Sequence, residues 1–151
     1  MKIAKRGDLN IEPLPAQRTT LALDRCFSSQ EMQKIRRGVT PSQMEDKWFV
    51  FWETGTLAFH RSWTGNCVYR VHFEGIGDSW RMVSADVNRD PDQYSGVSDD
   101  QDAQLISYLI DVLLLRQEAV FPSDVKNPGQ SALKSWSFVG RAALGEHPDD
   151  D

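Results

Sequence analysis

The chain has 151 residues, of which 40% are hydrophobic and 26% charged, a balance typical of one globular domain rather than a disordered or membrane-spanning chain. Its net charge of −5 argues against bulk binding of nucleic acid. The two cysteines are too few for a disulfide framework, and the N-terminal "MKIAKRGDLN" lacks the apolar run of a secretory signal, so we expect a cytoplasmic protein without membrane contact.

The first part of the chain predicts an arm, a strand and a short helix. Residues 1–18 contain Gly and Pro and show no hydrophobic period, so we expect a loose N-terminal arm. Alternation in "TTLALDR", residues 19–25, predicts a first strand. In "FSSQEMQKIRRG", Ser28 and Glu31 have the spacing of a capping box and Gly38 is a stop signal, which together predict a helix.

The middle of the chain predicts a series of strands. "KWFVFWE" and "TLAFHRSW" are separated by Thr54-Gly55, and "NCVYRVHFE" follows Thr64-Gly65. "WRMVSADVN" comes after a looser turn with two glycines. Short links that contain Gly between β-rich segments are typical of an antiparallel meander.

A second helix is predicted by "SDDQDAQLISYLIDVLLLRQE", at residues 101–118, with Ser98 as its cap. Its acidic first turn, which includes Asp102, favours the positive end of the helix, and apolar residues recur at helical spacing. We therefore expect an α+β fold, a single-layer antiparallel meander of four to five strands with this helix packed on one face. The domain would span residues 19–145 and end in an acidic tail at residues 146–151.

Alternation along the strands assigns side chains to the two faces of the sheet. If both Thr-Gly links are two-residue turns, one mostly apolar face lies against the helix, and it holds Phe49, Phe51, Ala58, His60, Ser62, Cys67, Tyr69, Val71 and Phe73. The other face then mixes aromatic and basic side chains. A turn of odd length would exchange part of this assignment, because a slip of one residue reverses every side chain.

The mixed face is the candidate binding site. Aromatic rings stack on bases or sugars, and arginines hold phosphate groups. Trp and Arg are also enriched at protein interfaces. The competing interpretation is that these rings pack under the arm or the C-terminal segment, with the arginines at the rim. The candidate binding residues are Trp48, Trp52, Arg61, Trp63, Arg70, His72 and Glu74.

Other constellations carry weaker signals. His60 and Cys67 fall on neighbouring strands and would suit a Cys–His nucleophile pair, but a buried Cys is ordinarily a small hydrophobic residue. "HRS" at residues 60–62 resembles one H-x-S motif of phosphoesterases that use two copies, and no second copy occurs. "DVNRDPD" resembles the start of a calcium loop, but Pro91 and Val97 stand where Gly and Glu are required. We predict no metal site and no cofactor.

The segments "MEDKWFVFWE" and "LAFHRSWTGNCVYRVHFE", within residues 44–74, resemble a phrase found in a family of small bacterial proteins of uncharacterised function. The resemblance implies a bacterial origin and a compact single domain, and it carries no catalytic residues over to this chain.

These observations favour a non-catalytic binding or protein-interaction module, such as a toxin-neutralising protein or a component of an assembly. Its acidity suits a basic protein partner, because complementary charge speeds encounter. The alternative is an enzyme that acts on a nucleotide or another phosphate-bearing small molecule. In that case Arg61 and Arg70 would hold phosphate, and His72 and Glu74 would do acid–base work.

Overall fold

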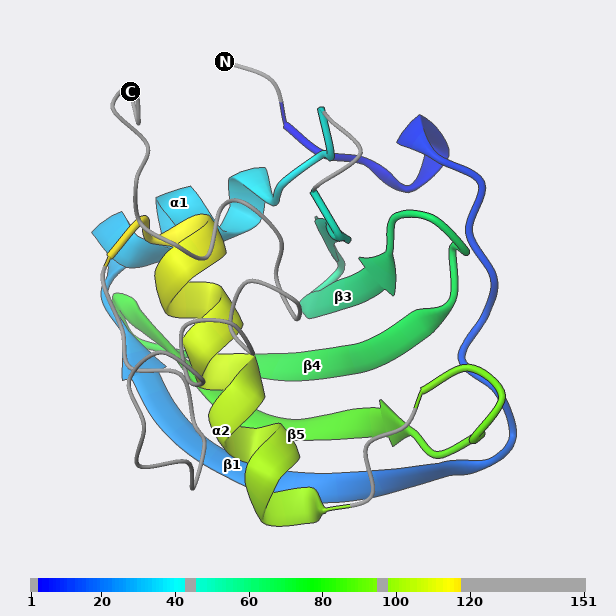
Figure 1. The fold of residues 1–151 in the computed structure, drawn as a ribbon. Helices are drawn as coiled ribbons and strands as arrows, with labels where there is room; N and C mark the ends of the chain where they lie inside the picture. The colour runs from blue at the N-terminus through cyan, green and yellow to red at the C-terminus, as the bar shows by residue number, and fades with distance from the viewer. Residues whose placement is uncertain (1–2, 43–45, 95–97, 118–151) are drawn as a thin grey trace, which may run out of the picture.

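The computed structural model describes residues 3–42, 46–94 and 98–117. It contains a five-stranded antiparallel sheet in the order β1-β5-β4-β3-β2 and two helices, which confirms the α+β class and the meander (Figure 1). The strands are β1 (Arg18–Phe27), β2 (Trp48–Glu53), β3 (Thr56–Arg61), β4 (Cys67–Ile76) and β5 (Ser79–Asn88). β2 to β5 follow one another across the sheet, and β1 pairs with β5 at the far edge.

Helix α1 (Ser29–Arg37) begins and ends where its signals predict. The Ser28 hydroxyl accepts a hydrogen bond from the Glu31 amide, and the Glu31 carboxylate accepts one from the Ser28 amide. Gly38 ends the helix with φ at +63°, and a Cβ there would lie 2.1 Å from the Val50 carbonyl oxygen. Only glycine therefore fits both the left-handed backbone and this close approach to β2.

Helix α2 (Asp99–Leu109) continues as the π-helical turn η2 (Ile110–Leu114) and crosses one face of the sheet (Figure 1). The cap is as predicted, since Ser98 accepts from the Gln101 amide. The helical segment ends before residue 118, because the backbone of Arg116 turns to φ +57°, a left-handed conformation that stops a helix. Residue 118 and the predicted acidic tail at 146–151 lie outside the described residues.

Two apolar clusters lie on the two sides of the sheet. The larger one joins the sheet to both helices, and it includes Val50, Leu57, Phe59, Tyr69, Val71, Met82, Ile106 and Leu109. The smaller one lies on the opposite side, which we call the back of the sheet, where Phe49, Phe51 and Ala58 pack against Ala4, Leu9 and Ile11. Residues 3–17, which include the 3-10 turn η1 (Arg6–Asp8), form an arm that covers the β2–β3 part of the back. Within the described ranges, no helix is both long and apolar enough to pass through a membrane.

The assignment of side chains to faces was wrong for β2 and β3. The Thr54-Gly55 link is a two-residue turn, as expected, with Glu53 opposite Thr56. The next link is longer, and the register between β3 and β4 shifts so that Phe59 faces Tyr69. This shift reverses β2 and β3 relative to β4. As a result, Phe49, Phe51 and Ala58 lie under the arm, while Val50, Leu57 and Phe59 lie under the helices with Tyr69.

Candidate functional site

The register shift divides the predicted binding residues between the two sides of the sheet. Trp48, Trp52 and Arg61 share the helix side, while Arg70, His72 and Glu74 share the back. Trp63 lies beyond the end of β3, in the turn that leads to β4. The seven residues therefore do not form one surface.

The two tryptophans on the helix side belong to the core. Trp48 is 2% exposed and stacks on the ring of Tyr69, with 6.0 Å between centroids. Trp52 packs edge-on against Phe73 and Trp80, with centroid distances of 5.2 and 5.6 Å. Trp48 is therefore a packing residue, and Trp52 is partly buried and packs against the same cluster.

Trp63 has the opposite environment, because its side chain is 70% exposed. The turn that carries it is held by hydrogen bonds on both sides. The Ser62 hydroxyl donates to the Asp46 carbonyl at 2.7 Å, and the Ser62 amide donates to the Lys47 carbonyl at 3.0 Å. The Gly65 amide donates to the Arg61 carbonyl at 2.8 Å. A large aromatic ring is thus presented to solvent on a fixed turn.

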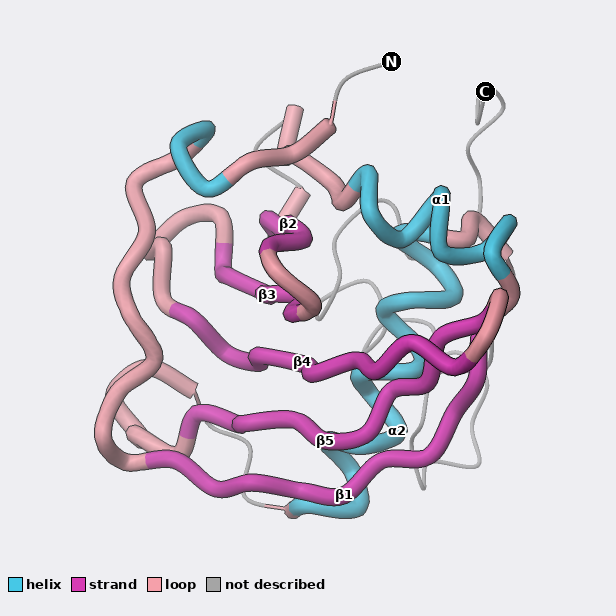
Figure 2. The backbone as a smooth tube through the Cα atoms, turned by 180° about the vertical axis from the view of Figure 1, so that it is seen from behind, coloured by secondary structure: helices cyan, strands magenta, loops and turns pink. Residues whose placement is uncertain are grey.

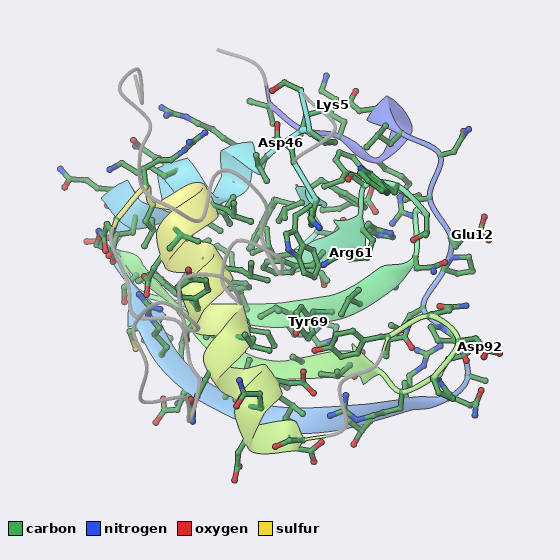
Figure 3. The ribbon with its side chains drawn as sticks, in the orientation of Figure 1. Lys5, Glu12, Asp46, Arg61, Tyr69 and Asp92 are labelled. Carbon is green, nitrogen blue, oxygen red and sulfur yellow. The ribbon has the colours of Figure 1, made fainter. Side chains whose placement is uncertain are left out.

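A pocket of about 190 Å³ lies beside this ring, and its described walls are Lys47, Arg61, Ser62, Trp63, Thr64 and Gln93. Arg61 lies on the helix side of the sheet (Figure 3). Its guanidinium is 4.7 Å from the centre of the Trp48 ring. Burial lowers the pKa of Arg61. Lys47 lies at the rim, 6.0 Å from the Trp63 ring. The pocket combines an aromatic wall, two hydroxyls, one amide and two cationic side chains.

On the back of the sheet, His72 lies in a chain of polar groups that spans four strands. Its Nε2 is 3.0 Å from Asp86 Oδ2, and its Nδ1 is 3.3 Å from the Thr56 hydroxyl. The Thr20 hydroxyl donates to Asp86 Oδ1 at 2.8 Å. Burial acts to raise the pKa of Asp86, but the hydrogen bonds from His72 and Thr20 outweigh it, and the pKa is lowered. Asp86 therefore stays ionised beside the imidazole.

The partner of His72 differs from the predicted one. Glu74 is exposed and lies opposite Arg81, whereas Asp86 holds the His72 ring. In the sequence, Asp86 stands out only as part of the calcium-like segment, which gives no sign of this role. Asp86 lies on β5, directly across from Arg70 on β4 and so close to His72. This position could have indicated the contact, but only if the register between the two strands had been known.

His60 and Cys67 lie opposite each other on β3 and β4, as the nucleophile-pair hypothesis requires. Burial raises the pKa of the Cys67 thiol to about 12, so the thiol keeps its proton at neutral pH. His60 Nδ1 donates to the Gly65 carbonyl at 2.9 Å, and burial lowers the pKa of its ring. Both side chains have the environment of structural residues.

A further polar group, which the sequence analysis missed, is buried under α2. Asp102 is 1% exposed and accepts hydrogen bonds from Tyr94 at 2.5 Å and Tyr69 at 3.3 Å. Burial raises the pKa of both tyrosines, so both keep the proton that they donate. The sequence predicted only that Asp102 favours the positive end of the helix, and its burial with these hydrogen-bond donors is a further role.

The calcium-like segment is used for local structure. Asn88 is buried, and its amide donates to the Cys67 carbonyl and to Gln93. Its side-chain oxygen accepts from the Asp90 amide, and Asp90 in turn accepts from the Asp92 amide. In the part of the chain that the structure describes, no three potential ligand residues group to hold a metal ion.

Comparison with protein-family models, with curated proteins and with solved structures finds no match for this chain.

Proposed function

We propose that this protein is a non-catalytic protein-interaction module, and that Trp63 is its principal contact residue. The observation that carries the proposal is the 70% exposure of Trp63 on a turn fixed by hydrogen bonds. Burying a Trp side chain removes a large apolar area from water, and Trp is the residue type most enriched among interface hot spots. A rigid turn loses little conformational entropy on binding.

The neighbourhood of Trp63 supports a protein partner over a small ligand. The pocket beside the ring is modest in volume and offers two hydroxyls, one amide and two cationic groups. It can take a single side chain of a partner while Trp63 covers the surface around it. The net charge of −5 favours a partner that is basic overall, because opposite charges speed association. Neutralising a basic toxin or joining an assembly are two roles for such a module.

The enzymatic alternative is supported by the Thr56–His72–Asp86 chain, in which a carboxylate orients an imidazole next to a hydroxyl. It is less favoured because it needs both arginines on one phosphate. Arg61 lies over Trp48 on the helix side, and Arg70 lies on the back beside Ala58. A backbone layer separates them.

Affinity capture with matched variants tests the proposed function. Tagged wild-type protein, Trp63→Ala and Ile76→Ala would be incubated with the same lysate of the source cells, and the recovered proteins would be quantified by mass spectrometry. Ile76 is the control, because it is also an exposed hydrophobic residue, at 48%, but lies in the β4–β5 hairpin. We expect at least one protein whose recovery falls about tenfold with Trp63→Ala, equivalent to about 1.4 kcal/mol, and is unchanged with Ile76→Ala. Recovery that is the same for all three proteins would contradict the proposal.

A further inference from the structure

The back of the sheet is open over β4, β5 and β1. Figure 2 shows these strands with no described element in front of them, while α2 lies behind and the arm runs past the β2–β3 end. Arg70 is half-buried in the middle of this open area, directly opposite Ala58 on one side and Asp86 on the other. The area is independent of the Trp63 turn.

No described residue accepts a hydrogen bond or ion pair from Arg70, although two carboxylates lie near it. Asp86, its cross-strand neighbour, has one oxygen bound by Thr20 and the other by His72. Glu53 is held by Arg6, with both carboxylate oxygens engaged and a shortest distance of 2.6 Å. Both nearby carboxylates therefore already accept hydrogen bonds from other side chains.

The Nε atom of Arg70 is enclosed by protein without a hydrogen-bond partner. The guanidinium is thus held in place by packing, and its terminal nitrogens are the donors left for an acceptor from solution. Burial of a cation is unfavourable unless an anion compensates it, so the position of Arg70 is one that an anion would stabilise.

The surrounding charges also favour an anion. Three guanidinium groups, those of Arg6, Arg18 and Arg70, lie close enough to Cys67 to act on its thiol. Two carboxylates, Glu53 and Asp86, lie in the same part of the back, and Glu74 lies further along β4. Arg18 is anchored by the backbone carbonyls of residues 14 and 15, so it contributes charge without leaving its place.

We infer that this open area binds an oxyanion group, a phosphate or a carboxylate, through Arg70. The planar guanidinium matches two oxygens of either group and binds them as a fork. Ser84, opposite His72 in the adjacent row of the sheet, is half-buried, and no described residue is hydrogen-bonded to its hydroxyl. It supplies a second donor on the same side of the anion.

NMR titration of the full chain labelled with ¹⁵N tests this site. Inorganic phosphate and acetate would be added in separate series, with sodium chloride at matched ionic strength as the reference. We expect saturable shifts of the amide signals of β4 and β5 around Arg70 with one or both anions, and none of that kind with chloride. The anion that saturates at the lower concentration identifies the phosphate or the carboxylate as the preferred group.

Variants decide whether Arg70 is responsible. Arg70→Gln should weaken the binding at least tenfold, and Arg37→Gln, an exposed arginine at the end of α1, should leave it unchanged. Ser84→Ala provides a milder variant, in which we expect weaker binding with an unchanged spectrum elsewhere. Shifts that grow linearly with salt, or that are equal in wild type and Arg70→Gln, would overturn the inference. Neither result of the anion titration would change the effect of Trp63→Ala on partner capture. The Arg70 site and the Trp63 interaction surface are therefore tested independently.

Discussion

Asp102 of α2 and Arg89, at the end of β5, are joined by a hydrogen-bonded ion pair with 2.5 Å between Oδ2 and Nη2. The other oxygen of Asp102 accepts from Tyr94 and Tyr69. One buried carboxylate therefore connects the start of α2 to β4, to the end of β5 and to the loop that follows it. Because both oxygens of the carboxylate have donors, the pair escapes much of the penalty of an unsatisfied buried charge.

Replacing Asp102 by Ala should therefore lower the free energy of unfolding by about 1–3 kcal/mol, since the change removes the acceptor shared by Arg89 and two tyrosine hydroxyls. Arg89 keeps its ion pair with Asp99, and the two hydroxyls keep their hydrogen bond to each other. Urea unfolding followed by tryptophan fluorescence measures the loss. Asp100→Ala is the matched control, because Asp100 is exposed in the same turn and should cost less than about 1 kcal/mol. Equal losses for the two variants would show that Asp102 acts only through the helix dipole.

The sequence predicted those parts of the fold that depend on neighbours along the chain. The capping box of Ser28, the Gly38 stop and the meander are local signals, and the structure confirms them. The register between β3 and β4 is not local. It depends on the turn after β3, where Ser62 is hydrogen-bonded to the backbone of residues 46 and 47. Residue 46 lies 16 positions before Ser62 in the sequence.

The prediction of the candidate site depended most on this register. Because the actual register differs from the expected one, Trp48 lies in the core rather than on an exposed face, and Arg61 and Arg70 lie on opposite sides of the sheet. The burial of Asp102 could not be predicted either, because its hydrogen-bond donors lie between 8 and 33 residues away in the sequence. Trp63 was expected on the mixed face at the end of a strand, whereas the structure places it in the turn after β3 with its side chain exposed. Its role in binding stays a prediction.

The two cysteines should react very differently with thiol reagents. Cys26 is exposed, whereas Cys67 is buried and its burial raises the pKa of the thiol to about 12. We expect the folded chain at pH 8 to take up one equivalent of Ellman's reagent rapidly and the second only in denaturant, because the thiolate is the reactive form. Cys26→Ser should abolish the rapid reaction. A rapid reaction that survives this change would mean that Cys67 is accessible.

His60 should make stability depend on pH near neutrality. Burial lowers the pKa of its ring, and the hydrogen bond to Gly65 opposes this only in part. The unfolded chain then takes up a proton below about pH 6.5 that the folded chain resists, so the stabilisation is present above that pH and is lost as the pH falls. Urea midpoints of wild type and His60→Asn between pH 7.5 and 5 measure this contribution. The advantage of wild type should shrink toward pH 5, and an advantage that stays constant would contradict the expectation.

The arm should be coupled to the β3–β4 turn through Gly65. This residue has φ at +79°, and a Cβ on it would lie 2.5 Å from the Asn10 carbonyl oxygen. Gly77, at φ +60°, would meet nothing within 4 Å. Both changes to Ala place a side chain in the left-handed region, at a cost of roughly 1–2 kcal/mol. Only Gly65→Ala also forces the arm away from the sheet.

We therefore expect Gly65→Ala to lower the free energy of unfolding by more than Gly77→Ala, and to free the arm while the sheet stays folded. Displacement of Asn10 would break the hydrogen bond from the Glu12 amide to the Gly65 carbonyl, which is 2.9 Å long. Limited trypsin digestion measures the release of the arm, since cleavage after Lys5 and Arg6 should be faster in Gly65→Ala than in Gly77→Ala. Equal cleavage rates and equal urea midpoints for the two variants would mean that the arm contributes no stability through this contact.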